Sequence, residues 1–289
     1  MTIDTKVKDD RKSGNPYRPL YVPVGNTGLE AGIYVATYNS KNRATLWHVD
    51  GGYKRKVLAT KGAPIGTRWG YNRIRALTVH QGELIFSNYG QIHSLKDYLK
   101  GEQPLAFSKR NRIDHLLSQG NKLSCVIHDK GSNPLCKVTK NGKIKPYLIK
   151  ADFETTLLDV CMHENKIHYL TGVRIRIKNR WSEDDLMYFG TLFQDLRSKE
   201  DTSNTETARW MCSSPKGLYI ASESEILGPI GSKELCLKEI SGQAATGLLV
   251  DDNENLFHIT RHSLHDTSQN QLLATFEDEI TAACFYRPK

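Results

Sequence analysis

A two-strand unit recurs along this chain: an apolar run, a tight turn and a second apolar run. Five copies are IRALTVHQGELIFSN, IDHLLSQGNKLSCVI, TLLDVCMHENKIHYLTG, ARWMCSSPKGLYIAS and ATGLLVDDNENLFHIT. The first apolar residues after the turns follow one another at intervals of 39, 44, 51 and 38 residues, and they are Leu84, Leu123, Ile167, Leu218 and Leu256. Because helical periodicity is scarce, this pattern predicts an all-β chain built from repeated antiparallel hairpins.

The two ends of the chain carry complementary halves of a sixth unit. Ile33, in AGIYVATY, lies 51 residues before Leu84, but residues 16–30 before it are rich in Pro and Gly. The final segment, EITAACFYRPK, has the pattern of a first strand with no second strand after it. Pairing residues 280–286 with residues 32–38 would complete the unit and close a ring, which removes exposed sheet edges.

These intervals predict a six-bladed β-propeller closed by N- and C-terminal strands in one blade. We expect residues 1–30 to form an N-terminal arm and lead-in segment, and residues 31–289 to form a single propeller domain. The predicted blades are residues 280–286 with 32–60, then 74–109, 113–149, 155–196, 209–240 and 244–277. A pair of β-sandwiches is the structural alternative.

Two hairpins carry a resemblance to a known group of proteins. The segments LVDDNENLF at 249–257 and HENKIHY at 163–169 resemble the Asp-x-x-Gly-Asn-hydrophobic hairpin, with Glu254 and Glu164 at the Gly position. The chain thereby resembles the six-bladed superfamily that includes NHL-repeat, TolB-like and gluconolactonase-like propellers. The resemblance implies a central channel, and several members of that superfamily are metal-dependent hydrolases.

Charge is distributed unevenly between the two halves of the chain. The formal net charge is +8, but residues 1–150 carry 26 Lys plus Arg against 10 Asp plus Glu, whereas residues 151–289 carry 14 against 22. A ring with this polarity attracts an anionic partner, and it also favours head-to-tail self-association. No apolar run approaches the roughly 20 residues of a membrane-spanning helix, and the polar start of the chain lacks an export signal. We therefore expect a cytoplasmic protein with no membrane partner.

The face that holds the loops between blades is where a binding site is expected. The longest such loop, residues 61–73, combines cations with two aromatic rings, and residues 109–112 are almost entirely basic. Guanidinium groups bind carboxylates or phosphates, and aromatic rings stack on bases. The predicted ligand-binding residues are Arg68, Trp69, Tyr71, Arg73, Arg110 and Arg112, with Lys41, Arg43, Tyr89, His128 and Lys130 from turns within blades. Alternatively, the two rings cover the channel mouth and the charges form a solvated rim.

Enzymatic signatures are weak. No GxSxG, P-loop or GxGxxG segment is present, and no carboxylate spacing demands a metal, so we predict no catalytic residue, metal or cofactor. The carboxylates that a channel enzyme would use are Asp114, Asp152, Glu154, Asp159, Glu206, Glu223, Glu225 and Asp278. His262 and His265 are the most cluster-like histidines. The six cysteines are widely spaced in mostly apolar runs, which predicts buried free thiols.

Residues 173–200 form an insertion in the fourth predicted blade. They begin with alternating apolar and cationic residues, which is typical of a half-exposed strand, and continue with residues that fit a strand or a short amphipathic helix. Blade completion and partner docking both remain open for this segment. The leading hypothesis is a non-catalytic propeller that recognises an acidic protein segment or other polyanion through the basic sector of its first three blades. RNA or DNA binding is the second hypothesis, and a channel-centred hydrolase or lyase is the third.

Overall fold

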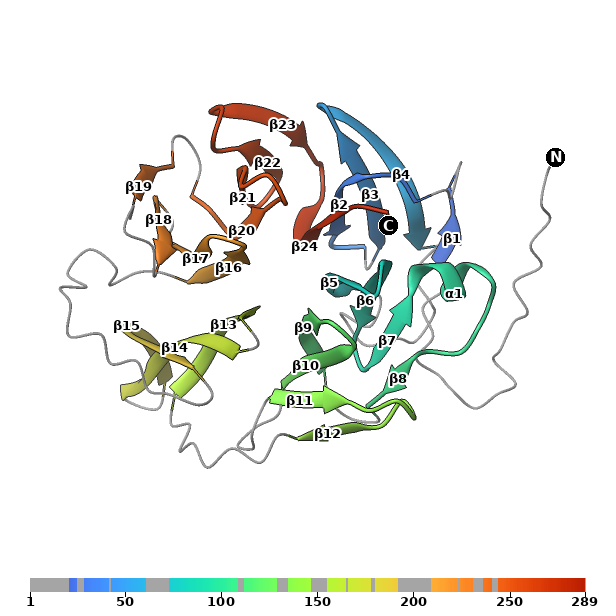
Figure 1. The fold of residues 1–289 in the computed structure, drawn as a ribbon, viewed down its shortest axis with the longest axis horizontal. Helices are drawn as coiled ribbons and strands as arrows, with labels where there is room; N and C mark the ends of the chain where they lie inside the picture. The colour runs from blue at the N-terminus through green and yellow to red at the C-terminus, as the bar shows by residue number, and fades with distance from the viewer. Residues whose placement is uncertain are drawn as a thin grey trace.

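A computed structural model describes most of the chain. The described residues are 21–24, 29–41, 43–60, 73–108, 112–128, 135–146, 155–164, 166–177, 180–191, 209–222, 224–230, 236–240 and 244–288. They form six antiparallel sheets arranged around a central axis (Figure 1). In each sheet the strand nearest the axis contacts the corresponding strand of the next sheet, and these inner strands are β5, β9, β13, β16, β20 and β24. This arrangement is a β-propeller.

The ring is closed by pairing between the two ends of the chain. β24 (Glu279–Tyr286) pairs antiparallel with β2 (Gly32–Tyr38), from Gly32 opposite Tyr286 to Tyr38 opposite Glu279. This confirms the predicted pairing of residues 280–286 with 32–38. The same sheet continues outward through β3 (Ala44–Asp50), β4 (Tyr53–Thr60) and β1 (Tyr21–Pro23). β1 belongs to the segment that the sequence predicts as a lead-in.

Four further sheets have four strands each. The second sheet contains β5 (Ile74–His80), β6 (Glu83–Asn88), β7 (Gln91–Ser94) and β8 (Ala106–Phe107), with helix α1 (Leu95–Leu99) after β7. The third contains β9 (Arg112–Gln119), β10 (Lys122–His128), β11 (Leu135–Val138) and β12 (Ile144–Pro146). The next two are β16 (Trp210–Ser214), β17 (Gly217–Ala221), β18 (Glu225–Ile230) and β19 (Cys236–Glu239), then β20 (Gly247–Val250), β21 (Leu256–Ile259), β22 (Ser263–Asp266) and β23 (Gln271–Thr275).

The remaining sheet has three described strands, β13 (Thr155–His163), β14 (Lys166–Ile177) and β15 (Arg180–Thr191). The structure therefore shows five complete blades, whereas the sequence predicts six. The difference arises in the predicted fourth blade, where β14 and β15 form a hairpin of 12 residues per strand and residues 192–208 lie outside the described residues. Within this insertion, the part that the sequence left open between strand and helix is a strand up to Thr191.

The core lies between neighbouring sheets rather than inside any one of them. One cluster joins the first and second sheets through side chains that include Tyr34, Leu46, Ile74 and Phe86. Further clusters fill the spaces between the second and third sheets and between the last sheet and the first. Because each blade buries its faces against its neighbours, the ring is stabilised only as a whole.

Glu254 and Glu164, which stand at the Gly position of the Asp-x-x-Gly-Asn-hydrophobic pattern, adopt left-handed backbone conformations. Glu254 has φ +66° and Glu164 has φ +46°. A side chain in this region costs roughly 1 kcal/mol. Glu254 offsets this cost with contacts to another blade, because its carboxylate accepts hydrogen bonds from the Tyr219 hydroxyl at 3.2 Å and the Lys216 backbone N–H at 3.3 Å.

Four of the described inner strands contain a β-bulge, an extra residue without a partner in the ladder. In β5, Ile74 pairs with Asn88 and Ala76 with Ser87, so Arg75 is the extra residue. The equivalent residues are Asp114 in β9, Leu158 in β13 and Thr281 in β24. A bulge redirects the side chains around it, and here it brings polar groups of adjacent blades into contact.

The bulge residue Thr281 links two blades. Its hydroxyl donates to the buried carbonyl of Ile74 at 2.6 Å, with the carbonyl of Ala36 at 3.3 Å. We expect Thr281→Val to lower the free energy of unfolding by about 1 kcal/mol, because it removes this donor while keeping the shape of the side chain. Urea denaturation measures the change. Thr275→Val, at an exposed position on β23, is the control, and equal losses in the two variants would contradict the assignment.

Candidate functional site

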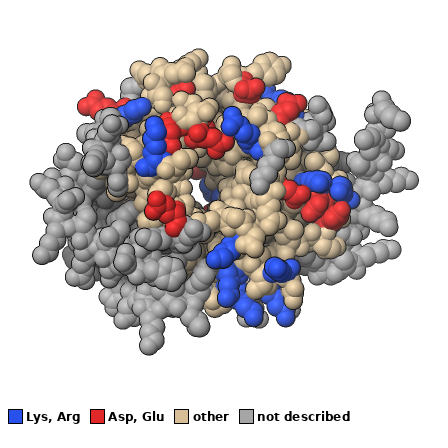
Figure 2. Space-filling model, viewed as in Figure 1, with Lys and Arg blue, Asp and Glu red and all other residues tan. Residues whose placement is uncertain are grey.

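The inner strands surround a channel of about 730 Å³ at the centre of the ring. Its opening is visible in the space-filling view (Figure 2). Polar side chains that line it include Arg75, Asp114, His115 and Asp159. They belong to three consecutive inner strands, so a site in the channel is assembled from separate blades.

Three arginines lie where β5 and β9 begin, and two of them contact Asp114. We call Arg73, Arg75, Arg112 and Asp114 the mouth cluster. The Arg112 guanidinium donates to the Asp114 carboxylate at 2.7 and 2.8 Å. Arg75 approaches the same carboxylate at 3.6 Å. Arg73 lies over the ring of Tyr38 at 5.8 Å, and its only carboxylate contact among the described residues is Glu279, at 3.9 Å.

The mouth cluster contains three guanidinium groups and one carboxylate, so its charges do not balance. Arg75 is 15% exposed, and burial followed by the neighbouring charge of Arg112 lowers its pKa from 12.5 to about 10. Its Nε is buried and has no hydrogen-bond partner within the described part of the chain. Arg73 and Arg112 are 31% and 34% exposed, so their guanidinium groups remain accessible from outside. The mouth cluster therefore holds more positive than negative charge among its described side chains.

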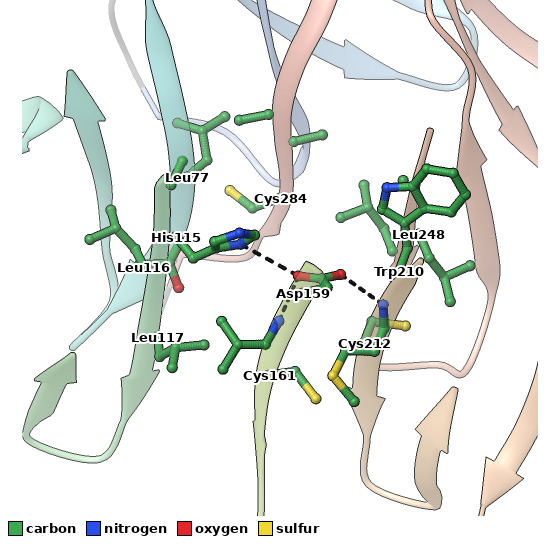
Figure 3. Close-up of a pocket in the computed structure, with 18 of the residues that line it drawn as sticks. Leu77, His115, Leu116, Leu117, Asp159, Cys161, Trp210, Cys212, Leu248 and Cys284 are labelled. Atoms are coloured by element: carbon green, nitrogen blue, oxygen red, sulfur yellow. Dashed lines mark hydrogen bonds and ion pairs between the residues drawn. The ribbon is translucent and has the colours of Figure 1, made fainter. Parts of the chain in front are cut away.

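Inside the channel, Asp159 links three blades (Figure 3). One carboxylate oxygen accepts from the Val160 backbone N–H at 2.8 Å and lies 3.4 Å from Nδ1 of His115, and the other accepts from the Met211 backbone N–H at 2.8 Å. Burial raises the pKa of Asp159, opposed by His115 and the two backbone donors. Because both oxygens are engaged by backbone N–H groups, this carboxylate serves to fix β9, β13 and β16 relative to one another.

The predicted ligand-binding residues are only partly within the described structure. Arg73 and Arg112, from different predicted loops, are both brought beside Arg75. Tyr89 has φ +24° and its carbonyl accepts the Ile113 N–H at 2.6 Å. The backbone N–H groups of Lys41 and Arg43 donate to the Asn39 side chain, and both side chains are exposed. Outside the described residues, or with the side chain outside them, lie Arg68, Trp69, Tyr71, Arg110, His128 and Lys130.

The structure adds residues that sequence reasoning missed. The sequence does not mark Arg75, because strict alternation along IRALTV does not reveal a bulge. Nothing in the local sequence of His115 marks it as facing Asp159. Among the carboxylates considered for a channel enzyme, Asp114 and Asp159 line the channel, and Asp278 accepts from Asn39 at 3.4 Å.

Two histidines stack in the last sheet, but they are not the pair that the sequence suggests. His262 is exposed, whereas His265 stacks on His258 with centroids 4.6 Å apart. His265 Nε2 lies 2.7 Å from the Ser263 hydroxyl, and His258 Nδ1 lies 2.9 Å from the Thr267 hydroxyl. Burial lowers the pKa of His265, and burial and then His265 lower the pKa of His258 to about 4. Both rings are thus neutral near pH 7, as expected of a packed structural pair.

The cysteines described with their side chains are free, and they are Cys125, Cys136, Cys161, Cys212 and Cys284. Burial raises the pKa of the channel-lining Cys161, Cys212 and Cys284, which disfavours a reactive thiolate. In the described residues no group of three or more His, Cys, Asp or Glu side chains is placed to hold a metal ion. The same residues contain no helix long and apolar enough to cross a membrane.

No protein-family model matches this chain, and no curated protein matches it. Several solved structures do. An extracellular domain from B. thetaiotaomicron, assigned to a hybrid two-component system, is 14% identical with a TM-score of 0.46, and the match covers 92% of this chain and 37% of that one. Virginiamycin B lyase from Staphylococcus aureus is 12% identical with a TM-score of 0.46, covering 88% of this chain and 87% of that one.

A protein of unknown function from Bacteroides caccae is 12% identical with a TM-score of 0.49, covering 90% of this chain and 100% of that one. The chain spans little more than a third of the length of the first of these structures. At such identities and TM-scores, the similarities carry no argument about activity. The fold assignment rests on the strand pairing described above.

Asp159 provides a direct test of the channel architecture. Asp159→Ala leaves the N–H groups of Val160 and Met211 without an acceptor, so we expect the free energy of unfolding to fall by about 2 to 4 kcal/mol. Asp252→Ala removes an exposed carboxylate whose contact with Arg287 is 3.5 Å long, and should cost less than about 0.5 kcal/mol. Urea denaturation compares the two variants. Similar losses would show that Asp159 does not link the blades.

The histidine pair predicts a pH dependence of stability. The pKa of His258 is about 4 in the folded chain and about 6.5 in the unfolded chain. The folded state is therefore fully stable above pH 6.5 with respect to this group, and it loses stability as the pH falls toward 4. The contribution of His258 should be of the order of 2 to 3 kcal/mol. Urea midpoints measured from pH 7.5 to 4 should therefore fall less steeply for His258→Asn than for the native chain. Parallel curves would contradict the lowered pKa.

Proposed function

We propose that this protein is a non-catalytic binding propeller that recognises an acidic protein segment at the mouth of its channel. The observation that carries the proposal is the excess of guanidinium over carboxylate in the mouth cluster. Arg75 and Arg112 share Asp114, and Arg73 has only a long contact with Glu279. Arg73 and Arg112 retain accessible donors. A carboxylate side chain of a bound peptide would complete the hydrogen bonding of Arg73 and Arg112.

The geometry favours a carboxylate over a nucleotide at this position. Arg112 is held in a fork-like contact with Asp114, and Arg73 is held over Tyr38. These are fixed, half-buried groups that fit a single planar anion on a narrow chain. Base stacking needs a free aromatic face, and the Tyr38 ring is already covered by Arg73. RNA or DNA binding at the mouth therefore stands as the second hypothesis.

We also propose that the ring is six-bladed, with β13, β14 and β15 forming the blade that the sequence predicts as the fourth. Two observations support this. β13 contacts β9 on one side and β16 on the other, as the remaining inner strands contact their own neighbours. The clusters of buried side chains include one between β13–β14 and β16–β17. The count then agrees with the six units in the sequence.

A peptide-binding measurement tests the function. A fluorescein-labelled peptide of twelve glutamates should bind the native protein, and binding should weaken at least about tenfold for Arg73→Gln with Arg112→Gln, since each lost charged hydrogen bond contributes about 1.5 to 3 kcal/mol. Fluorescence anisotropy gives the dissociation constants. The double variant Arg55→Gln with Lys216→Gln lowers the net charge equally, away from the mouth, and is the control.

Three outcomes would contradict the assignment. The first is equal binding by the mouth variant and the native protein. The second is equal weakening in the control variant, which would reduce the effect to net charge. The third is equally tight binding of a twelve-glutamine peptide, which would exclude carboxylate recognition. Thermal melting of all variants identifies any loss of binding that results from unfolding.

A further inference from the structure

A second cationic surface lies on the outer strands of the third sheet, away from the mouth cluster. We call it the lysine face, and it consists of Lys122, Lys137, Lys140, Lys143 and Lys145, all exposed. Figure 2 shows Lys and Arg side chains gathered over the region of β10, β11 and β12 without an acidic side chain beside them. None of these residues belongs to the ligand-binding set predicted from the sequence.

Strand register places three of these lysines, Lys137, Lys143 and Lys145, on one side of the sheet. Lys137 on β11 is directly opposite Lys145 on β12. Residues two positions apart in a strand share a face, so Lys143 lies on the same side as Lys145. Val138 and Ile144 occupy the opposite side and pack on the core between the second and third sheets. At these positions the alternation turns the apolar side chains toward the core and exposes the lysines on the opposite face.

This arrangement is costly for the isolated protein. Cβ atoms of directly opposite residues lie about 4.5 to 5.5 Å apart, and like charges at such positions are destabilising. Among the described residues, none of the five lysines forms an ion pair, although lysines elsewhere do. Lys96 pairs with Glu83 at 3.7 Å and Lys100 with Glu102 at 3.9 Å. The lysine face therefore lacks a compensating charge on this chain as far as it is described.

Protection of a sheet edge explains only part of the pattern. Lysines on edge strands discourage pairing with other chains, and β12 is the outer strand of its sheet, so Lys145 could serve that purpose. β11 lies inside the sheet, between β10 and β12, and has no free edge. Edge protection thus does not account for Lys137, or for placing it opposite Lys145.

We propose that the lysine face binds the phosphate backbone of a nucleic acid. Its cations are flexible point charges rather than the planar forks that recognise individual carboxylates, and repeated point charges suit a chain of regularly spaced phosphates. Phe, Tyr and Trp, the large aromatic side chains that stack on bases, do not occur in β10, β11 or β12. Contacts are therefore made to phosphates, and binding is independent of base sequence.

The salt dependence of RNA binding tests this proposal. A fluorescein-labelled single strand of twenty uridines should bind the native protein, with an affinity that falls linearly with salt on logarithmic axes. Neutralising Lys137, Lys140, Lys143 and Lys145 to Gln should reduce the slope by about 2 to 3, because each phosphate contact to a single strand contributes about 0.7. The matched control neutralises Lys96, Lys100, Lys216 and Lys238 to Gln and should leave the slope near the native value.

The same probe separates this surface from the mouth cluster. Arg73→Gln with Arg112→Gln should retain uridine binding, while the four-lysine variant should retain binding of the twelve-glutamate peptide. The proposal is overturned if the four-lysine variant keeps the native slope, or if the control loses as much. It is also overturned if that variant loses glutamate-peptide binding but not uridine binding, since the lysine face would then serve an acidic protein. Aggregation of the variant with unchanged RNA binding of its soluble fraction would leave edge protection as the role of these lysines.

Discussion

The pairing of β2 with β24 is the interaction on which the rest of the structure depends. It joins residues at opposite ends of the chain, from Gly32 with Tyr286 to Tyr38 with Glu279, and so makes the last strand the inner strand of the first sheet. Only then does β24 lie beside β5, where Thr281 reaches the Ile74 carbonyl and Glu279 approaches Arg73. The mouth of the channel is thus a consequence of ring closure.

Bulges determine which side chains reach the axis once the ring is closed. An extra residue in β5 and another in β9 bring Arg75 and Asp114 together from different blades. Deeper in the channel, Asp159 joins three inner strands through hydrogen bonds and His115. The lysines of the third sheet are exposed for a different reason. Strand alternation, without a bulge, places Lys137, Lys143 and Lys145 on one exposed face. The two cationic surfaces therefore suit different anions: a single carboxylate at the fixed arginines and a phosphate chain at the flexible lysines.

Much of this fold follows from the sequence, because period-two alternation and turn spacing locate hairpins without knowledge of their neighbours. The pairing of the chain ends follows from a strand without a partner at each end. The choice of Arg73 and Arg112 follows from the cations in the predicted loops between blades, residues 61–73 and 109–112. Arg75, His115 and the Lys137–Lys145 pair depend on bulges, contacts between blades and strand register. None of these leaves a local pattern in a single sequence. The structure of the insertion in the fourth predicted blade also differs from the prediction. Turn spacing alone does not show that β14 and β15 form a hairpin of 12 residues per strand.

A crystal structure of the protein with a glutamate-rich peptide would test the central claim most directly, namely that ring closure builds an anion site at the channel mouth. The account predicts a peptide carboxylate within hydrogen-bonding distance of the Arg73 or Arg112 guanidinium, with β24 paired to β2. A peptide bound on the lysine face or elsewhere on the ring, with the mouth arginines left unoccupied, would contradict it.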